Sequence, residues 1–327
     1  HLLDKITELT RAYRTYISPE EDIEIKISNF YSNVQSPILT DLRLDFGREV
    51  SVSKVYPRDL PDLFKGSSLT VLGRYRGHGE ARVALSGRIR EKEKTFRFSA
   101  GDGFKEAGDS DSEKNDFIPP LWAARRIGYL LDQVRLHGQD KELVEEITQL
   151  ARTYGIITPY TSYLIVEDER NNVNRRVIRE EDQTLGQIAG QDRSFEKKNR
   201  EEYSVMNAKS GAGSVRASTE VQQLHEAENY DQARPGVSRM NFKDAEGRVR
   251  QVTAQVKNIQ GRAVYNIGNY WVDSHVQRQK NQRVKRIQFA TGAYFELLKK
   301  EPLSGQFLAL GKNLRFVLND TIYEIYE

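Results

Sequence analysis

The chain has 327 residues, of which 38% are hydrophobic, 30% are charged and none is cysteine. The absence of cysteine excludes disulfides, thiolate catalysis and cysteine-bound zinc, and 50 basic against 47 acidic residues are too balanced to indicate nucleic-acid binding by themselves. No apolar run is long enough to cross a membrane, and the length favours two or three domains.

Residues 1–35 show helical spacing on either side of a short extended piece at 12–17. The second helix is expected to start at Ser18, a good N-cap, with Pro19 at the first helical position. Its apolar residues fall on one face, at Ile23, Ile27, Phe30 and Val34. A chain that opens on a helix without a preceding cap suggests a start within a domain, so we expect further sequence upstream.

Residues 36–167 are expected to form a β-sandwich-like module that ends in a helical hairpin. Short strand-like runs at 42–46, 69–75, 81–85 and 95–98 are separated by glycine and charged turns, which is the pattern of a sandwich. A polar loop at 101–115 follows them.

The segment 116–167 is the most clearly punctuated part of the chain. Pro119 and Pro120 can open a helix, and Gly138 can end it. Arg125 and Arg126 lie outside its apolar stripe and are expected to be on the polar face. A second helix is expected over 140–155, and the run 156–166 is expected to form a strand after a bend at Pro159.

Residues 168–248 contain few branched or aromatic residues and are expected to be an extended linker, with a helix near 218–230. Between 169 and 290 the chain has 22 lysines and arginines against 15 acidic residues. A solvated tether and a docking arm for an acidic partner both fit this excess.

Residues 249–327 are expected to form a small α+β module. Strand patterns lie at 252–259, 263–267, 270–273, 283–289, 314–318 and 322–326, with a helix at 293–300. The last two strands should form a hairpin around Asn319 and Asp320. The whole chain is therefore expected to be a multidomain α+β protein.

No catalytic constellation is evident. The five histidines are scattered and none has the i, i+4 spacing of a helical metal pair: His1, His78, His137, His225 and His275. There is no G-x-S-x-G motif and no P-loop, so we do not expect an enzyme, and we assign no catalytic, cofactor or metal residue.

Two charged clusters could bind ions. The acidic loop has carboxylates with partly calcium-like spacing at Asp102, Asp109, Asp111 and Glu113, but it lacks the glycine and distal acid of an EF-hand, and a solvated loop is favoured. The basic tract consists of Arg278, Lys280, Arg283, Lys285 and Arg286. It could bind a polyanion, with Tyr270 and Trp271 as stacking neighbours, or it could protect an edge strand from aggregation.

Three stretches of the chain are distinctive: 1–34; 37–72, with SPILTD at 36–41 and VYPRDLPDLF at 55–64; and 116–167. Together they resemble the inter-alpha-trypsin inhibitor heavy chains and bacterial proteins that combine a vault-inter-alpha-trypsin (VIT) domain with a von Willebrand factor A (VWA) domain. Residues 287–324 resemble, more weakly, a C-terminal module of some of these bacterial proteins.

The resemblance implies an adhesion or scaffold protein that is secreted, periplasmic or bound to the cell envelope and that binds a protein or an extracellular polymer. In the family, a VWA domain holds a divalent cation, Mg²⁺ or Ca²⁺, at an Asp-x-Ser-x-Ser motif. We find none of those ligands here, nor the Asp-Pro-His site through which heavy chains are linked to hyaluronan. The resemblance thus implies that 1–35 is the C-terminal end of a VWA-like domain, with the VIT portion and the metal site upstream.

Two functions remain open at this stage. The first is a non-enzymatic adhesion or scaffold protein, and the second is an assembly component that binds polyanions through the basic region 170–290. Homo-oligomerisation is also open.

Overall fold

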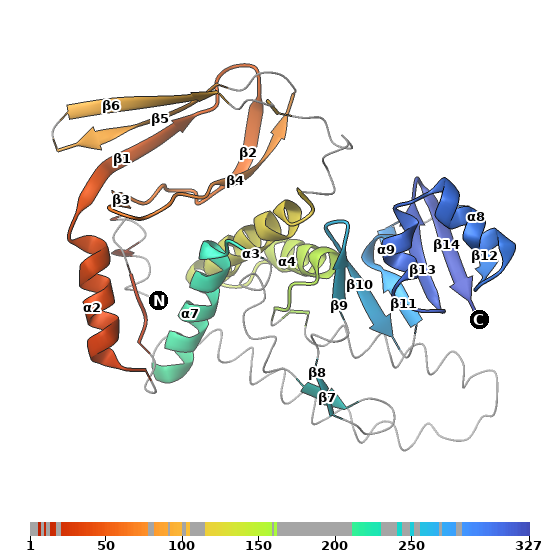
Figure 1. Ribbon diagram of the computed structural model, residues 1–327. Helices are drawn as coiled ribbons and strands as arrows, with labels where there is room; N and C mark the ends of the chain where they lie inside the picture. The colour runs from red at the N-terminus through yellow and green to blue at the C-terminus, as the bar shows by residue number, and fades with distance from the viewer. Residues whose placement is uncertain are drawn as a thin grey trace. The chain divides into compact units, whose positions relative to one another are not determined.

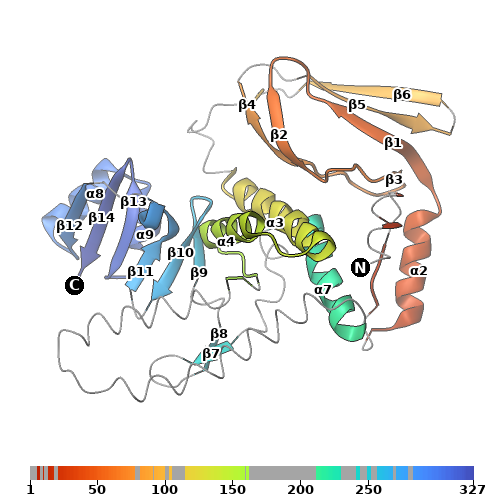
Figure 2. The same ribbon diagram turned by 180° about the vertical axis from the view of Figure 1, so that it is seen from behind.

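The computed structural model describes residues 6–7, 10, 14–17, 21–77, 82–90, 92–99, 103–104, 115–158, 160–161, 211–229, 241–243, 249–251, 256–267, 270–278 and 283–327. The chain divides into two compact units (Figures 1 and 2). Unit 1 consists of His1–Gly138 and Val205–Ala233, and unit 2 consists of Gln139–Ser204 and Arg234–Glu327. Each combines helices with sheet, as expected for a multidomain α+β chain.

Unit 1 contains the six strands of the N-terminal half of the chain. They are β1 (Pro37–Asp45), β2 (Ser51–Tyr56), β3 (Leu63–Phe64), β4 (Leu72–Arg76), β5 (Arg82–Ile89) and β6 (Lys92–Ser99). Four of them pair in the order β3-β1-β5-β6, with antiparallel neighbours, and β2 pairs with β4. The strands expected near 69–75, 81–85 and 95–98 correspond to β4, β5 and β6.

Helix α2 (Ile23–Val34) begins later than the sequence indicates. Its N-cap is Asp22, whose carboxylate accepts hydrogen bonds from the backbone N–H groups of Glu24 and Ile25. An aspartate in this place satisfies two orphan N–H groups, which makes the predicted cap at Ser18 wrong. On the predicted apolar face, Ile23 and Ile27 are both more than half exposed, whereas Phe30 and Val34 are partly buried.

Helix α3 (Ile118–His137) is the core of unit 1. The predicted start at two prolines and the predicted stop at Gly138, with φ of 91°, are confirmed. It packs against β2, β4 and helix α7 (Gly211–Glu226). Residues 168–248 are therefore not extended throughout: the helix expected at 218–230 begins earlier, and its buried side chains, such as Val221 and Leu224, pack in unit 1.

Unit 2 is built on a mixed sheet in the order β12-β14-β13-β11-β10-β9 (Figure 1). Its strands are β9 (Val256–Ile259), β10 (Arg262–Ile267), β11 (Tyr270–Asp273), β12 (Val284–Gln288), β13 (Leu314–Leu318) and β14 (Thr321–Tyr326). The short 3-10 helix η4 (Ser274–Arg278) follows β11, and helices α8 (Gly292–Lys300) and α9 (Ser304–Leu308) precede β13. A separate pair, β7 (Asn241–Lys243) with β8 (Val249–Gln251), completes the described strands.

The core of unit 2 lies between the sheet and helices α8 and α9. Phe307 of α9 stacks on Phe316 of β13 with ring centroids 4.7 Å apart, and both are fully buried. The predicted hairpin is confirmed, because Asn319 and Asp320 have φ of 45° and 57°, as a two-residue turn of the primed type requires.

Helix α4 (Lys141–Tyr154) packs on β10 and η4. It is capped by Asp140 and ends at Gly155, as predicted. Ile156 and Ile157 are then buried in an irregular segment. Of the strand predicted after the Pro159 bend, only residues 160 and 161 are described; they lie in a turn, where Thr158 and Thr161 hydrogen-bond to each other, and the rest of that prediction lies outside the described residues.

Candidate functional site

The predicted basic tract lies at an edge of the sheet in unit 2. Arg283 immediately precedes β12, and Lys285 and Arg286 lie within it; all three are exposed. Arg278 ends η4, but its side chain and the whole of Lys280 are outside the described residues. Three of the five residues therefore lie at one edge strand, two within it and one immediately before it.

Two of these three side chains also make contacts within the sheet. Nε of Arg286 donates to Glu324 of β14 at 3.0 Å, and its guanidinium lies 5.0 Å from the ring centroid of Tyr326. Nζ of Lys285 lies 5.7 Å from the ring centroid of Tyr323. Exposed ion pairs are worth little, so a stronger anionic ligand could compete for Arg286.

The two aromatic neighbours of the tract are held in the sheet. Trp271 packs against the core cluster of unit 2, so its ring stabilises the fold. Burial and, after it, the nearby Glu324 raise the pKa of Tyr270 to about 12, while Arg315 and Arg286 act in the opposite direction. Tyr270 is therefore an uncharged phenol at neutral pH.

A connected polar group in unit 2 is centred on Asp273, at the end of β11. This carboxylate is fully buried and accepts from two backbone N–H groups, that of His275 at 2.9 Å and that of Val317 at 3.1 Å. Nε of Arg262 lies 3.4 Å from Oδ2 of Asp273, which is an electrostatic contact more than an aligned hydrogen bond.

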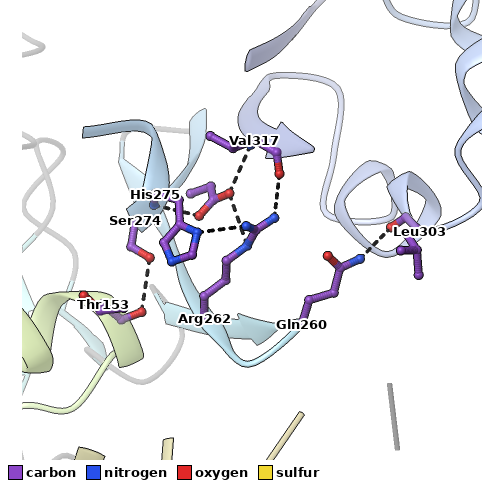
Figure 3. Close-up of polar contacts among 8 residues, drawn as sticks. Thr153, Gln260, Arg262, Ser274, His275, Leu303 and Val317 are labelled. Carbon is purple, nitrogen blue, oxygen red and sulfur yellow. Dashed lines mark hydrogen bonds and ion pairs between the residues drawn. The ribbon is translucent and has the colours of Figure 1, made fainter. Parts of the chain in front are cut away.

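Arg262 extends this group to a second strand. Its Nη2 donates to the carbonyl of Val317 at 2.6 Å, and its Nη1 lies 2.9 Å from Nδ1 of His275 (Figure 3). Its guanidinium also lies 5.1 Å from the ring centroid of Phe307. These contacts join β10, β11, η4 and β13. In them, the charged groups of Arg262 and Asp273 hydrogen-bond to backbone groups of residues 275 and 317.

A second polar group fixes helix α3 in unit 1. Arg125 is 4% exposed; its Nε and Nη2 donate to the carbonyl of Ala227 at 3.3 and 3.2 Å, and its Nη1 donates to the carbonyl of Thr70. Burial lowers the pKa of Arg125, and Glu228 and Glu226 oppose this effect. Arg126 is 8% exposed and donates to the hydroxyl of Tyr56 at 2.6 Å.

The prediction placed Arg125 and Arg126 on the polar face of the helix, and the structure shows that both are buried there. Sheet and helix cover α3 on more than one side, and arginine can be buried there because carbonyl and hydroxyl oxygens accept from its donors. Around the same helix, Nε2 of His225 on α7 lies 2.8 Å from Oδ2 of Asp132 on α3. Sequence spacing gives no sign of this pair, which joins residues 93 positions apart.

Metal binding finds no support in the described part of the chain, where no three histidine or acidic side chains are grouped so that they could hold an ion. The acidic loop residues Asp102, Asp109, Asp111 and Glu113 lie outside the described residues. The divalent cation that the resemblance implies was expected outside this chain, so its site stays a prediction. None of the described helices has the length and apolarity needed to span a bilayer.

Comparison with known proteins gives a distant relationship. No family model and no solved structure matches the chain. It is 25% identical over 179 residues, 52% of the chain, to inter-alpha-trypsin inhibitor heavy chain H3 of Rattus norvegicus, and 27% identical over 169 residues, 47% of the chain, to heavy chain H1 of Bos taurus.

Heavy chain H1 of Mesocricetus auratus is 24% identical over 155 residues, 46% of the chain. These matches cover 20%, 17% and 17% of the three relatives, so the chain spans no more than about a fifth of their length. Over about half its length, the chain is thus a distant relative of the inter-alpha-trypsin inhibitor heavy chains.

Proposed function

We propose that this chain is part of a non-enzymatic adhesion or scaffold protein that works outside the cytoplasm, in the secreted, periplasmic or envelope-associated manner that the resemblance implies. The observation that carries the proposal is that two buried charged side chains hydrogen-bond to backbone groups of the fold. Arg125 and Asp273 are each surrounded by backbone groups that they hold in place. Catalytic charges, by contrast, must face a substrate.

The distant similarity to heavy chains over about half of the chain supports the same reading. The metal-dependent ligand binding of a VWA domain is a further part of the proposal. The ligands of that cation would have to come from residues other than those described here.

A binding assay tests this function directly. The 327-residue chain is immobilised, and its binding to extracellular matrix proteins and to hyaluronan is measured by interferometry with Mg²⁺, with Ca²⁺ and with EDTA. We expect saturable binding that leaves the ligand chemically intact. Turnover of an ester, peptide or glycoside substrate that a single serine or histidine substitution abolishes would overturn the proposal.

The alternative function, polyanion binding, is favoured by one observation: Lys285 and Arg286 on edge strand β12 and Arg283 immediately before it are all exposed. Binding of this kind releases counterions, so its affinity must fall steeply with salt. We expect the triple alanine variant of β12 to bind heparin more weakly and with a shallower salt dependence than the parent chain.

A matched control changes two lysines of unit 2 outside the tract, Lys299 and Lys300 at the end of α8, to alanine. If this control weakens heparin binding as much as the β12 variant does, the interaction depends on net charge and is not a site. Absent binding, or binding that salt does not affect, removes the alternative.

A further inference from the structure

Strand β6 is the outermost strand of the four-stranded sheet of unit 1 (Figure 1). Within the described part of the chain it pairs with β5 alone, and all its residues are exposed. The pairing runs from Ile89 opposite Lys92 to Arg82 opposite Ser99 without a bulge, and β6 contains no proline. Proteins often guard such an edge with bulges, prolines, very short strands or charged side chains, and of these devices β6 has only the charged side chains.

The side chains of β6 alternate between two faces. One face has Phe96 and Phe98, which are 41% and 55% exposed, in line with two lysines. The other face has Glu93 and Arg97, and neither charge takes part in an ion pair with another described residue. Exposed phenylalanines on a regular edge suggest a partner strand, whereas lysines alone would suffice to protect it.

The sequence of β6 is complementary to itself when it is reversed about Thr95. In an antiparallel pair of two copies centred there, Glu93 of each lies opposite Arg97 of the other, which gives two ion pairs. On the second face each phenylalanine lies opposite a lysine of the other copy, where a cation can interact with the ring. These pairs are Lys92 with Phe98 and Lys94 with Phe96.

Neighbouring registers that keep each face on its own side are less favourable. A pair centred on Lys94 places that lysine opposite itself, and like charges directly opposite each other are destabilising. A pair centred on Phe96 places Glu93 opposite Ser99 and contains neither ion pair. The charges of β6 therefore select the register centred on Thr95.

We propose that two copies of this chain associate through β6, antiparallel and related by a two-fold axis at Thr95, so that their two sheets become one. The axis makes the interface isologous, which is the common arrangement of homodimers. One strand pair buries less than a standard interface of about 1,600 Å². The dimer is accordingly weak and depends on protein concentration, and it goes beyond the adhesion or scaffold function proposed above.

Charge-swap variants of the 327-residue chain test the interface by sedimentation equilibrium. In Glu93→Arg both ion pairs become arginine pairs, and in Arg97→Glu both become glutamate pairs. Because two cross-strand attractions turn into repulsions, we expect each variant to associate about tenfold more weakly. An equimolar mixture of the two variants should associate again, since every pair in the mixed dimer joins an arginine to a glutamate.

The double variant E93R/R97E should likewise form a dimer as the parent chain does. Matched controls reverse two exposed charges of unit 1 away from β6, in Glu49→Arg and Lys65→Glu, and should leave association unchanged. A folding defect cannot imitate this pattern, because mixing two misfolded chains does not restore binding.

Four results would overturn the proposal. The parent chain could remain a monomer at every concentration tested. It could also stay monomeric and bind an extended peptide along β6, which would make the occupant of this edge a peptide and not a second copy. The dimer could form equally well in both single variants, which would place the interface elsewhere. The mixture could fail to associate while both single variants are monomeric and folded, which would exclude the register.

Discussion

Removal of the Asp273 carboxylate should strongly destabilise unit 2. The substitution Asp273→Ala leaves the backbone N–H groups of His275 and Val317 without their acceptor. It also leaves the guanidinium of Arg262 partly buried, with 13% side-chain exposure, and without its counter-charge.

The size of the effect follows from the geometry. Two unit charges 3.4 Å apart attract each other by about 5 kcal/mol at an effective dielectric constant of about 20. In the native protein the cost of desolvating the two charges offsets much of this attraction. When one partner alone is removed, the desolvation cost of the remaining charge is not recovered. We therefore expect the free energy of unfolding of unit 2 to fall by about 3–5 kcal/mol.

The chain offers a convenient assay, because each unit has one tryptophan: Trp122 is on α3 and Trp271 is on β11. In a Trp122→Phe background, fluorescence during urea unfolding reports on unit 2. With a slope of about 2 kcal/mol per molar urea, a loss of 4 kcal/mol lowers the midpoint by about 2 M. The control Glu296→Ala removes an exposed i, i+4 pair with Lys300 and should cost at most about 0.5 kcal/mol.

A double-mutant cycle with Arg262→Met separates the ion pair from the rest of the network. The double variant should be more stable than the sum of the two losses predicts, by about 1.5 kcal/mol, because no unpaired charge remains buried. A loss below about 1 kcal/mol for Asp273→Ala, or additive losses in the cycle, would refute the reasoning.

Three further predictions concern single residues. Arg125→Met should lower the stability of unit 1 by about 2–4 kcal/mol, measured by urea unfolding in a Trp271→Phe background, because two buried carbonyls lose their donor. Gly128→Ala should cost about 1–3 kcal/mol in the same assay, since an added Cβ would lie 3.1 Å from Cβ of Leu224 and force α3 and α7 apart; a stabilised variant would contradict this packing. The pKa of Tyr270 is about 12 in the folded state and 10 in the unfolded state, so its contribution to stability is complete below pH 10 and is lost as the pH rises to 12. In Tyr270→Phe the free energy of unfolding of unit 2 should therefore fall less between pH 10 and pH 12.

The sequence predicts well those features that depend on residues close together in the chain. The double proline and Gly138 mark the ends of α3, Asp140 marks the start of α4, and the Asn319–Asp320 turn marks the last hairpin. In each case the backbone geometry depends on a residue type within a few positions, through a cap, a fixed φ or a positive φ.

The features that the sequence does not predict depend on distant segments. Helical periodicity places Arg125 on the polar side of α3, but the acceptor of its hydrogen bonds is the carbonyl of Ala227, 102 residues away. The low apolar content around α7 suggests a tether, yet Gly128 of α3 allows that helix to approach closely. Asp273 does carry a local sign, since its side chain accepts from the N–H two residues later, as aspartates often do at turns.

The basic tract shows the same division. The bounds of its strand were predicted to within one residue at each end. The ion pair of Arg286 with Glu324 could not be predicted, because it forms only when β12 lies beside β14 in the sheet. Whether the tract binds polyanions depends on how firmly such internal partners hold its charges.

The division of unit 1 into His1–Gly138 and Val205–Ala233 has a consequence for its synthesis. A ribosome completes α3 long before it reaches α7, so a nascent chain displays the buried side of α3, with Arg125 lacking its Ala227 acceptor, throughout the translation of some seventy intervening residues. Folding of the first unit is therefore expected to finish late, after part of the second has already emerged. A nascent chain arrested before 205 should accordingly be a better substrate for chaperones and proteases than one arrested after 233.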